Sequence, residues 1–182
     1  VDLQTNVKAM QNQAYARKVK ISNLQQMANT IIYVQENGFN TQEDLKTKLS
    51  SENTRLSKTQ EKLSTLNEEL LSVNEKIHFT GIYQKHKRTY LAFLNSENKN
   101  EFRQEHSAEI TAYEEARNWI KTHYDCQKLE TLSTLKEKKS QLQESIKEEQ
   151  KLLYSQRQFC HDLEIANKNV SEILMNKNII KR

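Results

Sequence analysis

Histidine and cysteine are the residue types in this chain that most readily bind metals or act in catalysis, and their spacing forms no recognisable site. The five histidines stand singly, without a His-x-His or His-Glu-x-x-His pattern, and no cysteine pair has metal-ligand spacing. Two glycines are too few for a phosphate-binding loop, and no nucleophile elbow or Cys-x-x-Cys pair occurs. We therefore expect no catalytic residue, no metal and no cofactor. The histidines are His78, His86, His106, His123 and His161.

A run of cationic and aromatic residues over 83–90 is the strongest candidate for binding. It reads Tyr-Gln-Lys-His-Lys-Arg-Thr-Tyr, so groups that meet phosphates stand beside rings that stack on bases. The alternative is a solvated basic helix face whose tyrosines pack inside the fold, opposite Glu109, Glu114 and Glu115. A second basic cluster, near the start of the chain, has the same two interpretations. The candidate binding residues are Arg17, Lys18, Lys20, Tyr83, Lys85, Lys87, Arg88, Tyr90 and Arg103.

The composition favours long helices. The 182 residues include no proline, 35% are hydrophobic and 29% charged, which suits an elongated helical fold with narrow apolar seams. A net charge of +4 does not by itself indicate nucleic acid. Two cysteines, no signal segment and no membrane-length apolar run favour a reducing cytoplasm. We expect Cys160 to act as a small hydrophobe and Cys126 to lie in a polar turn, and the start at Val1 indicates a piece of a longer protein.

Helix signals divide this elongated unit into four parts. An amphipathic helix is expected from Leu3 onward, ending at Asn37 and Gly38. The Thr41 hydroxyl is placed to cap the next helix, and Ser107 to cap a later one. Apolar positions of the first helix are Val19, Leu24, Met27, Ile31, Ile32 and Val34. The parts are 1–40 (amphipathic helix), 41–94 (first long helix), 95–131 (helical cap, after a turn over 95–100) and 132–182 (second long helix).

The two long helices each carry an apolar seam with heptad spacing. The connecting segment is too short to carry the chain back along a rod, so the second helix must return antiparallel to the first. The predicted fold is therefore all-α: a long antiparallel coiled-coil hairpin with a small helical cap at its tip and an N-terminal amphipathic helix. An intermolecular coiled coil is the alternative. The seams comprise Leu45, Leu49, Glu52, Leu56, Thr59, Leu63, Leu66, Leu70, Val73 and Ile77, and Leu132, Leu135, Lys139, Leu142, Ile146, Glu149, Leu153, Gln156, Cys160, Leu163, Asn167, Val170 and Leu174.

Several short segments occur in an order that resembles one protein family. They are Tyr15-Ala16-Arg17-Lys18, Asn23 to Thr30, Tyr33 to Gly38, Tyr83 to Tyr90, Phe102 to His106 with Glu109-Ile110, and Leu129 to Leu132. This order resembles the region just past the nuclease domain in relaxases, the mobilisation nucleases of Gram-positive plasmids and integrative conjugative elements. The resemblance covers nearly the whole chain and rests on ordinary residue types, so its weight comes from length and order.

The resemblance implies a non-catalytic C-terminal accessory region. In the family, the N-terminal domain is a metal-dependent single-strand endonuclease that uses a tyrosine nucleophile, and we transfer no such role to this chain. The implied task is recruitment of the relaxase–DNA complex to the type IV secretion coupling ATPase and to relaxosome proteins during conjugation. The implied location is the bacterial cytoplasm, with passage into the recipient cell beside the DNA as a further option.

Three other interpretations stay open. One is an origin-of-transfer DNA-binding module, in which Lys85, Lys87, Arg88 and Arg103 neutralise phosphates and a tyrosine at 83 or 90 stacks on single-stranded bases. Another is a coiled-coil homodimerisation domain. The last is a secretion signal that is read while partly unfolded.

Overall fold

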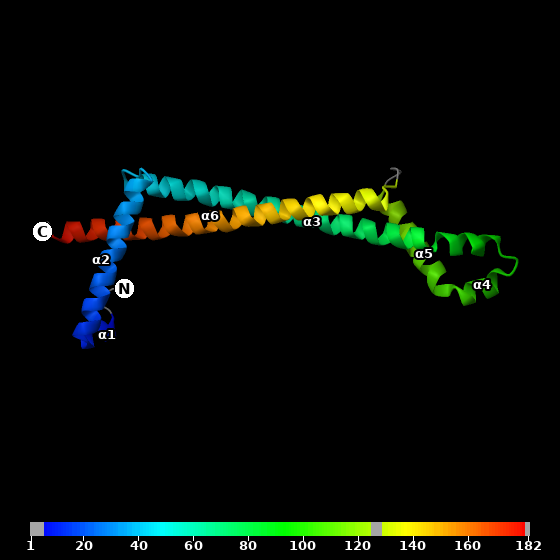
Figure 1. Cartoon of the computed structure of the whole chain (residues 1–182), viewed down its shortest axis with the longest axis horizontal. Coiled ribbons are helices and arrows are strands. Elements are labelled where there is room, and N and C mark those ends of the chain that lie inside the picture. Colours follow the sequence, from blue (N-terminus) through cyan, green and yellow to red (C-terminus); the bar gives the residue numbers. More distant parts are fainter. Residues whose placement is uncertain (1–5, 125–128, 181–182) are drawn as a thin grey trace. The chain divides into compact units, whose positions relative to one another are not determined.

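The computed structural model of the chain describes residues 6–124 and 129–180, and these residues fold into helices joined by short turns (Figure 1). The all-α prediction is confirmed. Leu3 and Cys126, for which the sequence predicts a helix and a turn, lie outside the described residues, as do positions 181–182. The helices are α1 (Val7–Gln11), α2 (Gln13–Glu36), α3 (Gln42–Asn95), α4 (Lys99–Glu105), α5 (Ser107–His123) and α6 (Leu132–Ile180).

Two of the predicted helix ends are confirmed in detail. Gly38 has a φ of 70°, and its N–H donates to the carbonyl oxygen of Gln35 at 3.1 Å, which closes α2. At the start of α3, the Asp44 N–H donates to Thr41 Oγ1 at 3.1 Å. In return, the Thr41 N–H donates to Asp44 Oδ2 at 2.8 Å. This reciprocal pair is a capping box with a shorter acidic side chain.

Other predicted boundaries were wrong. The first helix is interrupted at Asn12, whose Oδ1 accepts a hydrogen bond from the Tyr15 N–H at 3.1 Å and so begins α2. Ser107 does not cap: it is the first residue of α5, and the N-cap residue His106 makes no side-chain cap hydrogen bond. The predicted turn over 95–100 is shorter, because α3 includes Asn95 and the Asn98 side chain caps α4.

The single apolar face predicted for the first helix also needs correction. Val19 is buried and Met27 and Val34 are half-buried, whereas Leu24 and Ile31 are exposed although they belong to the same predicted set. An α-helix turns by about 100° per residue, and the two groups therefore occupy different sides of α2. The helix has one covered and one uncovered apolar side.

The chain divides into two compact units, one that contains both ends of the chain and one formed by its central part. The terminal unit contains α1, α2, α3 up to Thr59 and α6 from Leu152. Its core is formed by Leu45, Leu163 and Ala166. The Gln42 side chain bonds to Ser171, so the start of α3 lies beside the end of α6. Side chains packed against this core are Tyr33, Val34, Phe39, Leu49, Phe159 and Val170.

The central unit contains α3 from Gln60, the helices α4 and α5, and α6 up to Lys151. An ion pair joins Lys62 of α3 to Glu149 of α6. Ile110 and Ala116 of α5 and Leu135 of α6 have no exposed surface, and Thr80 of α3 is equally buried. The aromatic residues of α3 and α5 pack in the same unit.

Burial along α3 and α6 follows the predicted seam positions within each unit. Every seam residue of α3 from Leu45 to Ile77 is buried or half-buried, including Glu52 and Thr59. Along α6 the same holds from Leu132 to Val170, while Leu174 is exposed. The polar seam members are therefore inside the packing surfaces, where each needs a partner for its polar atoms.

Candidate binding surfaces

The tyrosines of the basic–aromatic run are engaged inside the central unit. Tyr83 stacks on Tyr113 of α5 with ring centroids 4.9 Å apart and an interplanar angle of 20°. Tyr90 stacks on the same residue at 4.3 Å and 22°. Tyr113 is only 5% exposed. A base could stack on Tyr83 or Tyr90 only at the ring faces that Tyr113 leaves free.

The packing around Tyr113 also fixes the ionisation state of its hydroxyl. Burial raises the pKa of Tyr113 to about 12, and hydrogen bonding and electrostatic coupling to the Tyr83 hydroxyl act in the same direction. The nearby Arg117 guanidinium opposes this rise only in part. The Tyr113 hydroxyl therefore stays protonated to a higher pH than that of an ordinary tyrosine.

The basic residues of the same run are exposed on the last turns of α3. Lys85, Lys87 and Arg88 form no ion pair within the described part of the chain, and Lys87 Nζ lies 6.0 Å from the Tyr83 ring centroid. No Asp or Glu occurs in α3 after Glu75. The last turns of the helix therefore present positive charge that no neighbouring residue on α3 neutralises.

Arg103, the remaining candidate of this region, has a different environment. Its Nη2 lies 3.0 Å from Glu114 Oε2, in an ion pair between α4 and α5. Its guanidinium carbon also lies 5.7 Å from the Phe93 ring centroid. Because this charge is already paired, Arg103 fits the structural interpretation better than a role in phosphate binding.

Two exposed leucines extend the basic surface toward the end of α3. Leu91 and Leu94 are each 47% exposed, and with Lys87 or Arg88 they recur at spacings of three or four residues, so they share one side of the helix. The sequence did not identify these leucines as binding residues, because leucines at this spacing are typical of a helix side that the fold buries. Lys87, Arg88, Leu91 and Leu94, together with the exposed Lys85 that lies about 120° around the helix from Leu91, are named the α3 face.

The second predicted cluster lies in the terminal unit. Arg17, Lys18 and Lys20 are exposed on the first half of α2 and make no ion pair with other described residues. This cluster and the α3 face belong to different units.

A shallow groove of about 600 Å³ lies between α2 and α6 in the terminal unit. Thr30 and Tyr33 of α2 and Asp162 and Asn169 of α6 contribute to its walls. Thr30 Oγ1 accepts a hydrogen bond from Asn169 Nδ2 at 2.8 Å, which ties the two helices together. Burial raises the pKa of the Tyr33 hydroxyl, and the Asp162 carboxylate adds to this effect.

Two of the histidines contact neighbouring side chains, and the described cysteine is buried. His123 stacks on Trp119 at 4.1 Å, and His106 Nδ1 lies 3.3 Å from Glu109 Oε2. Among the described residues, no group of three or more His, Cys, Asp or Glu side chains could hold a metal ion. Burial raises the pKa of the Cys160 thiol, and Glu52 and Glu164 raise it further, so its thiolate is disfavoured.

No described helix combines the length and the apolar content needed to cross a bilayer. Comparison of the chain with protein-family models, with curated proteins and with solved structures finds no match.

Proposed function

We propose that this chain is the non-catalytic C-terminal accessory region of a conjugative relaxase. In this role it recruits the relaxase–DNA complex, in the bacterial cytoplasm, to the type IV coupling ATPase and to relaxosome proteins. The family assignment rests on the ordered segments that resemble the region past the relaxase nuclease domain. The observation that carries the recruiting role is the α3 face, in which exposed leucines stand beside unpaired basic residues.

The chemistry of the α3 face indicates the kind of partner surface. Its leucines offer apolar area for burial, as the apolar side of a helix does in a protein groove. Its lysines and Arg88 can pair with carboxylates at the edge of such a groove, where charges direct approach and orientation. The expected partner surface is an apolar groove bordered by Asp and Glu.

A helical hairpin would present this face. We propose that α3 and α6 pair as a long antiparallel coiled coil and that α4 and α5 form a helical cap beyond it. Support comes from the seam positions, which are covered within each unit, and from the Lys62–Glu149 ion pair in the central unit. Buried polar members such as Glu52 disfavour alternative registers.

The second candidate function is binding of origin-of-transfer DNA. Lys85, Lys87 and Arg88 favour it, because unpaired basic side chains neutralise phosphates and release counterions. Against it stands the engagement of Tyr83 and Tyr90 with Tyr113, which removes part of the stacking surface that single-strand binding uses. Protein recruitment therefore explains more features of the α3 face than DNA binding does, because it uses the exposed leucines as well as the basic residues.

A pair of matched variants separates these functions. Lys85→Glu/Lys87→Glu/Arg88→Glu reverses the basic residues of the α3 face, and Leu91→Ser/Leu94→Ser removes only its apolar part. The control Lys136→Glu/Lys147→Glu/Lys151→Glu makes the same charge change at exposed positions of α6.

Recruitment predicts that both α3-face variants lose binding to the purified coupling ATPase while the control retains it. DNA binding predicts that the leucine variant retains its affinity for origin DNA and that the charge variant loses both affinity and salt dependence. If the purified ATPase binds both α3-face variants as tightly as the unchanged chain, the proposed recruiting surface is wrong.

A further inference from the structure

An uncovered apolar stripe runs along α2, apart from the α3 face. Ile21, Leu24, Ala28 and Ile31 follow one another at spacings of three, four and three residues, and Ile32 flanks them. The four large side chains are between 48% and 57% exposed. This spacing is the heptad pattern with which helices pair side by side.

The stripe lies on the side of α2 that the terminal unit leaves open. Val19 and Thr30 are buried and Asn23, Met27 and Val34 are half-buried, and together they mark the covered side. At about 100° per residue, the stripe is centred roughly 130° around the helix from them. Within the described part of the terminal unit, about half of the surface of its large side chains stays exposed.

Charge is distributed unevenly along the same helix. No charged residue occurs from Ile21 to Gln35. Arg17, Lys18 and Lys20 precede this neutral segment, and Glu36 ends it. Two copies of α2 packed in parallel would bring their basic ends together, whereas two antiparallel copies would bring each basic end beside the other copy's Glu36.

We propose that the α2 stripe is a self-association surface, through which two copies of the chain pair with their α2 helices antiparallel. Antiparallel heptad packing places Ile21 of one copy against Ile31 of the other, and Leu24 against Ala28. Lys18 and Glu36 lie on the same flank of the stripe, so each Lys18 reaches the other copy's Glu36. The arrangement is two-fold symmetric, so the basic end of each α2 lies beside Glu36 of the other copy.

The size of the contact indicates a weak, reversible dimer. From Arg17 to Gln35 the helix rises about 27 Å. A single helix pair of this length falls below the roughly 1,200–2,000 Å² of stable interfaces. Self-association is therefore expected in the micromolar range or weaker. It goes beyond the proposed recruiting function and uses none of the α3 face, and two relaxase copies would meet through it.

Sedimentation equilibrium of the whole chain over a concentration series tests the proposal. The unchanged chain should show a monomer–dimer equilibrium. Leu24→Ser should weaken it at least tenfold, because each dimer loses two apolar contacts at its centre. The matched control Leu71→Ser removes a leucine of α3 that is 65% exposed, against 57% for Leu24, and should change nothing. Since both positions are exposed, circular dichroism should show full helicity for both variants.

A charge exchange tests the antiparallel arrangement. Lys18→Glu and Glu36→Lys should each weaken self-association, because each change creates two like-charge contacts per dimer. A mixture of the two single variants should form heterodimers that restore both opposite-charge contacts. The proposal is overturned if the unchanged chain is monomeric at every concentration, or if Leu24→Ser dimerises as the unchanged chain does. It is also overturned if the mixture of the two charge variants associates no more tightly than each variant alone.

Discussion

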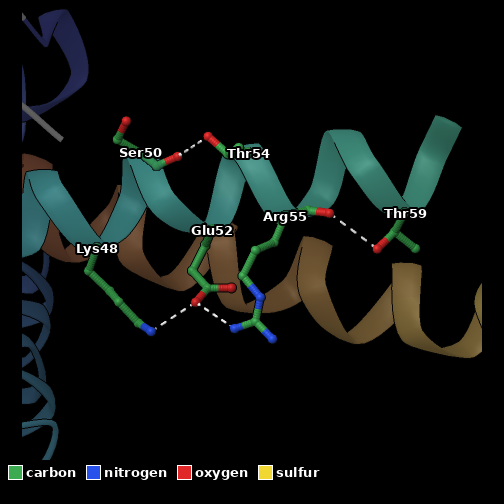
Figure 2. A network of polar contacts seen from close by, with 6 residues as sticks. All are labelled: Lys48, Ser50, Glu52, Thr54, Arg55 and Thr59. Carbon is green, nitrogen blue, oxygen red and sulfur yellow. Dashed lines mark hydrogen bonds and ion pairs between the residues drawn. The ribbon is translucent and has the colours of Figure 1, made fainter. Parts of the chain in front are cut away.

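Glu52 is the acidic residue that the packing of the terminal unit buries most completely, and replacing it tests how the seam is stabilised. Glu52 is 4% exposed. Its Oε1 lies 2.8 Å from Lys48 Nζ and 3.2 Å from Arg55 Nη1 (Figure 2). Nearby, the Thr54 and Thr59 hydroxyls donate to backbone carbonyl oxygens one turn earlier in α3. Glu52 thus occupies a seam position, and two cations of its own helix balance the charge of its carboxylate.

Glu52→Leu should stabilise the chain. A buried leucine contributes about 1.5–3 kcal/mol relative to an exposed one. The cations of the two lost contacts have side chains that are 40% and 64% exposed, and each contact is worth about 0.2–1 kcal/mol. Lys48 and Arg55 are exposed enough to be solvated after the change, so no unpaired buried charge remains. The net gain is about 1 kcal/mol, which raises Tm by about 3 °C for a chain of this size.

The pH dependence of the stabilisation expected for Glu52→Leu provides a second test. The hydrogen bond from Lys48 holds the pKa of Glu52 below 4.5, its ordinary value, although burial opposes this effect. A lowered folded-state pKa means that the stabilisation is present above pH 4.5 and is lost as the pH falls through the folded-state pKa. The leucine variant has no such loss, and its advantage should widen in acid.

Thermal and urea unfolding followed by circular dichroism measures both effects. Glu61→Leu, at an exposed position of α3 outside the seam, is the control and should leave Tm within about 1 °C. If Glu52→Leu lowers the free energy of unfolding, the carboxylate stabilises the seam beyond its two ion pairs, and the reasoning is refuted.

Three further predictions concern the central unit and the start of α3. Tyr113→Ala should cost about 3 kcal/mol, because it removes the ring on which Tyr83 and Tyr90 stack, and urea unfolding followed by Trp119 fluorescence would show the loss. The Tyr113 pKa of about 12 also predicts that stability falls as the pH rises above 10.0, since the unfolded state loses that proton first; unfolding at alkaline pH with Tyr113→Phe as control measures this. Thr41→Ala removes the α3 cap and should cost about 1 kcal/mol in chemical denaturation.

Local sequence signals predicted much of the fold. The 3–4 apolar spacing located the seam positions that are buried, because a helix side repeats with a period set by its own backbone. The left-handed Gly38 and the Thr41 cap were likewise predictable, since both are decided within a few residues. The interruption at Asn12 was not, because asparagine also occurs within helices when its side chain faces solvent.

The environments of the candidate binding residues required the tertiary structure. The sequence identified Tyr83 and Tyr90 as binding candidates but not Tyr113 as their partner, because that contact joins α3 to α5. Periodicity shows that a helix has an apolar side, but it does not show which side the rest of the chain covers. For that reason Leu91 and the α2 stripe emerged only from exposure in the folded chain.

The most direct test of the recruiting function is calorimetric titration of the whole chain with the purified cytoplasmic part of a coupling ATPase from the same conjugative system. The same titration is repeated with origin-of-transfer DNA across a salt series. We expect saturable binding to the ATPase that the Leu91→Ser/Leu94→Ser variant abolishes, and weaker binding to DNA. Absence of ATPase binding, together with tight DNA binding that falls steeply with salt, would contradict recruitment and support the DNA-binding module.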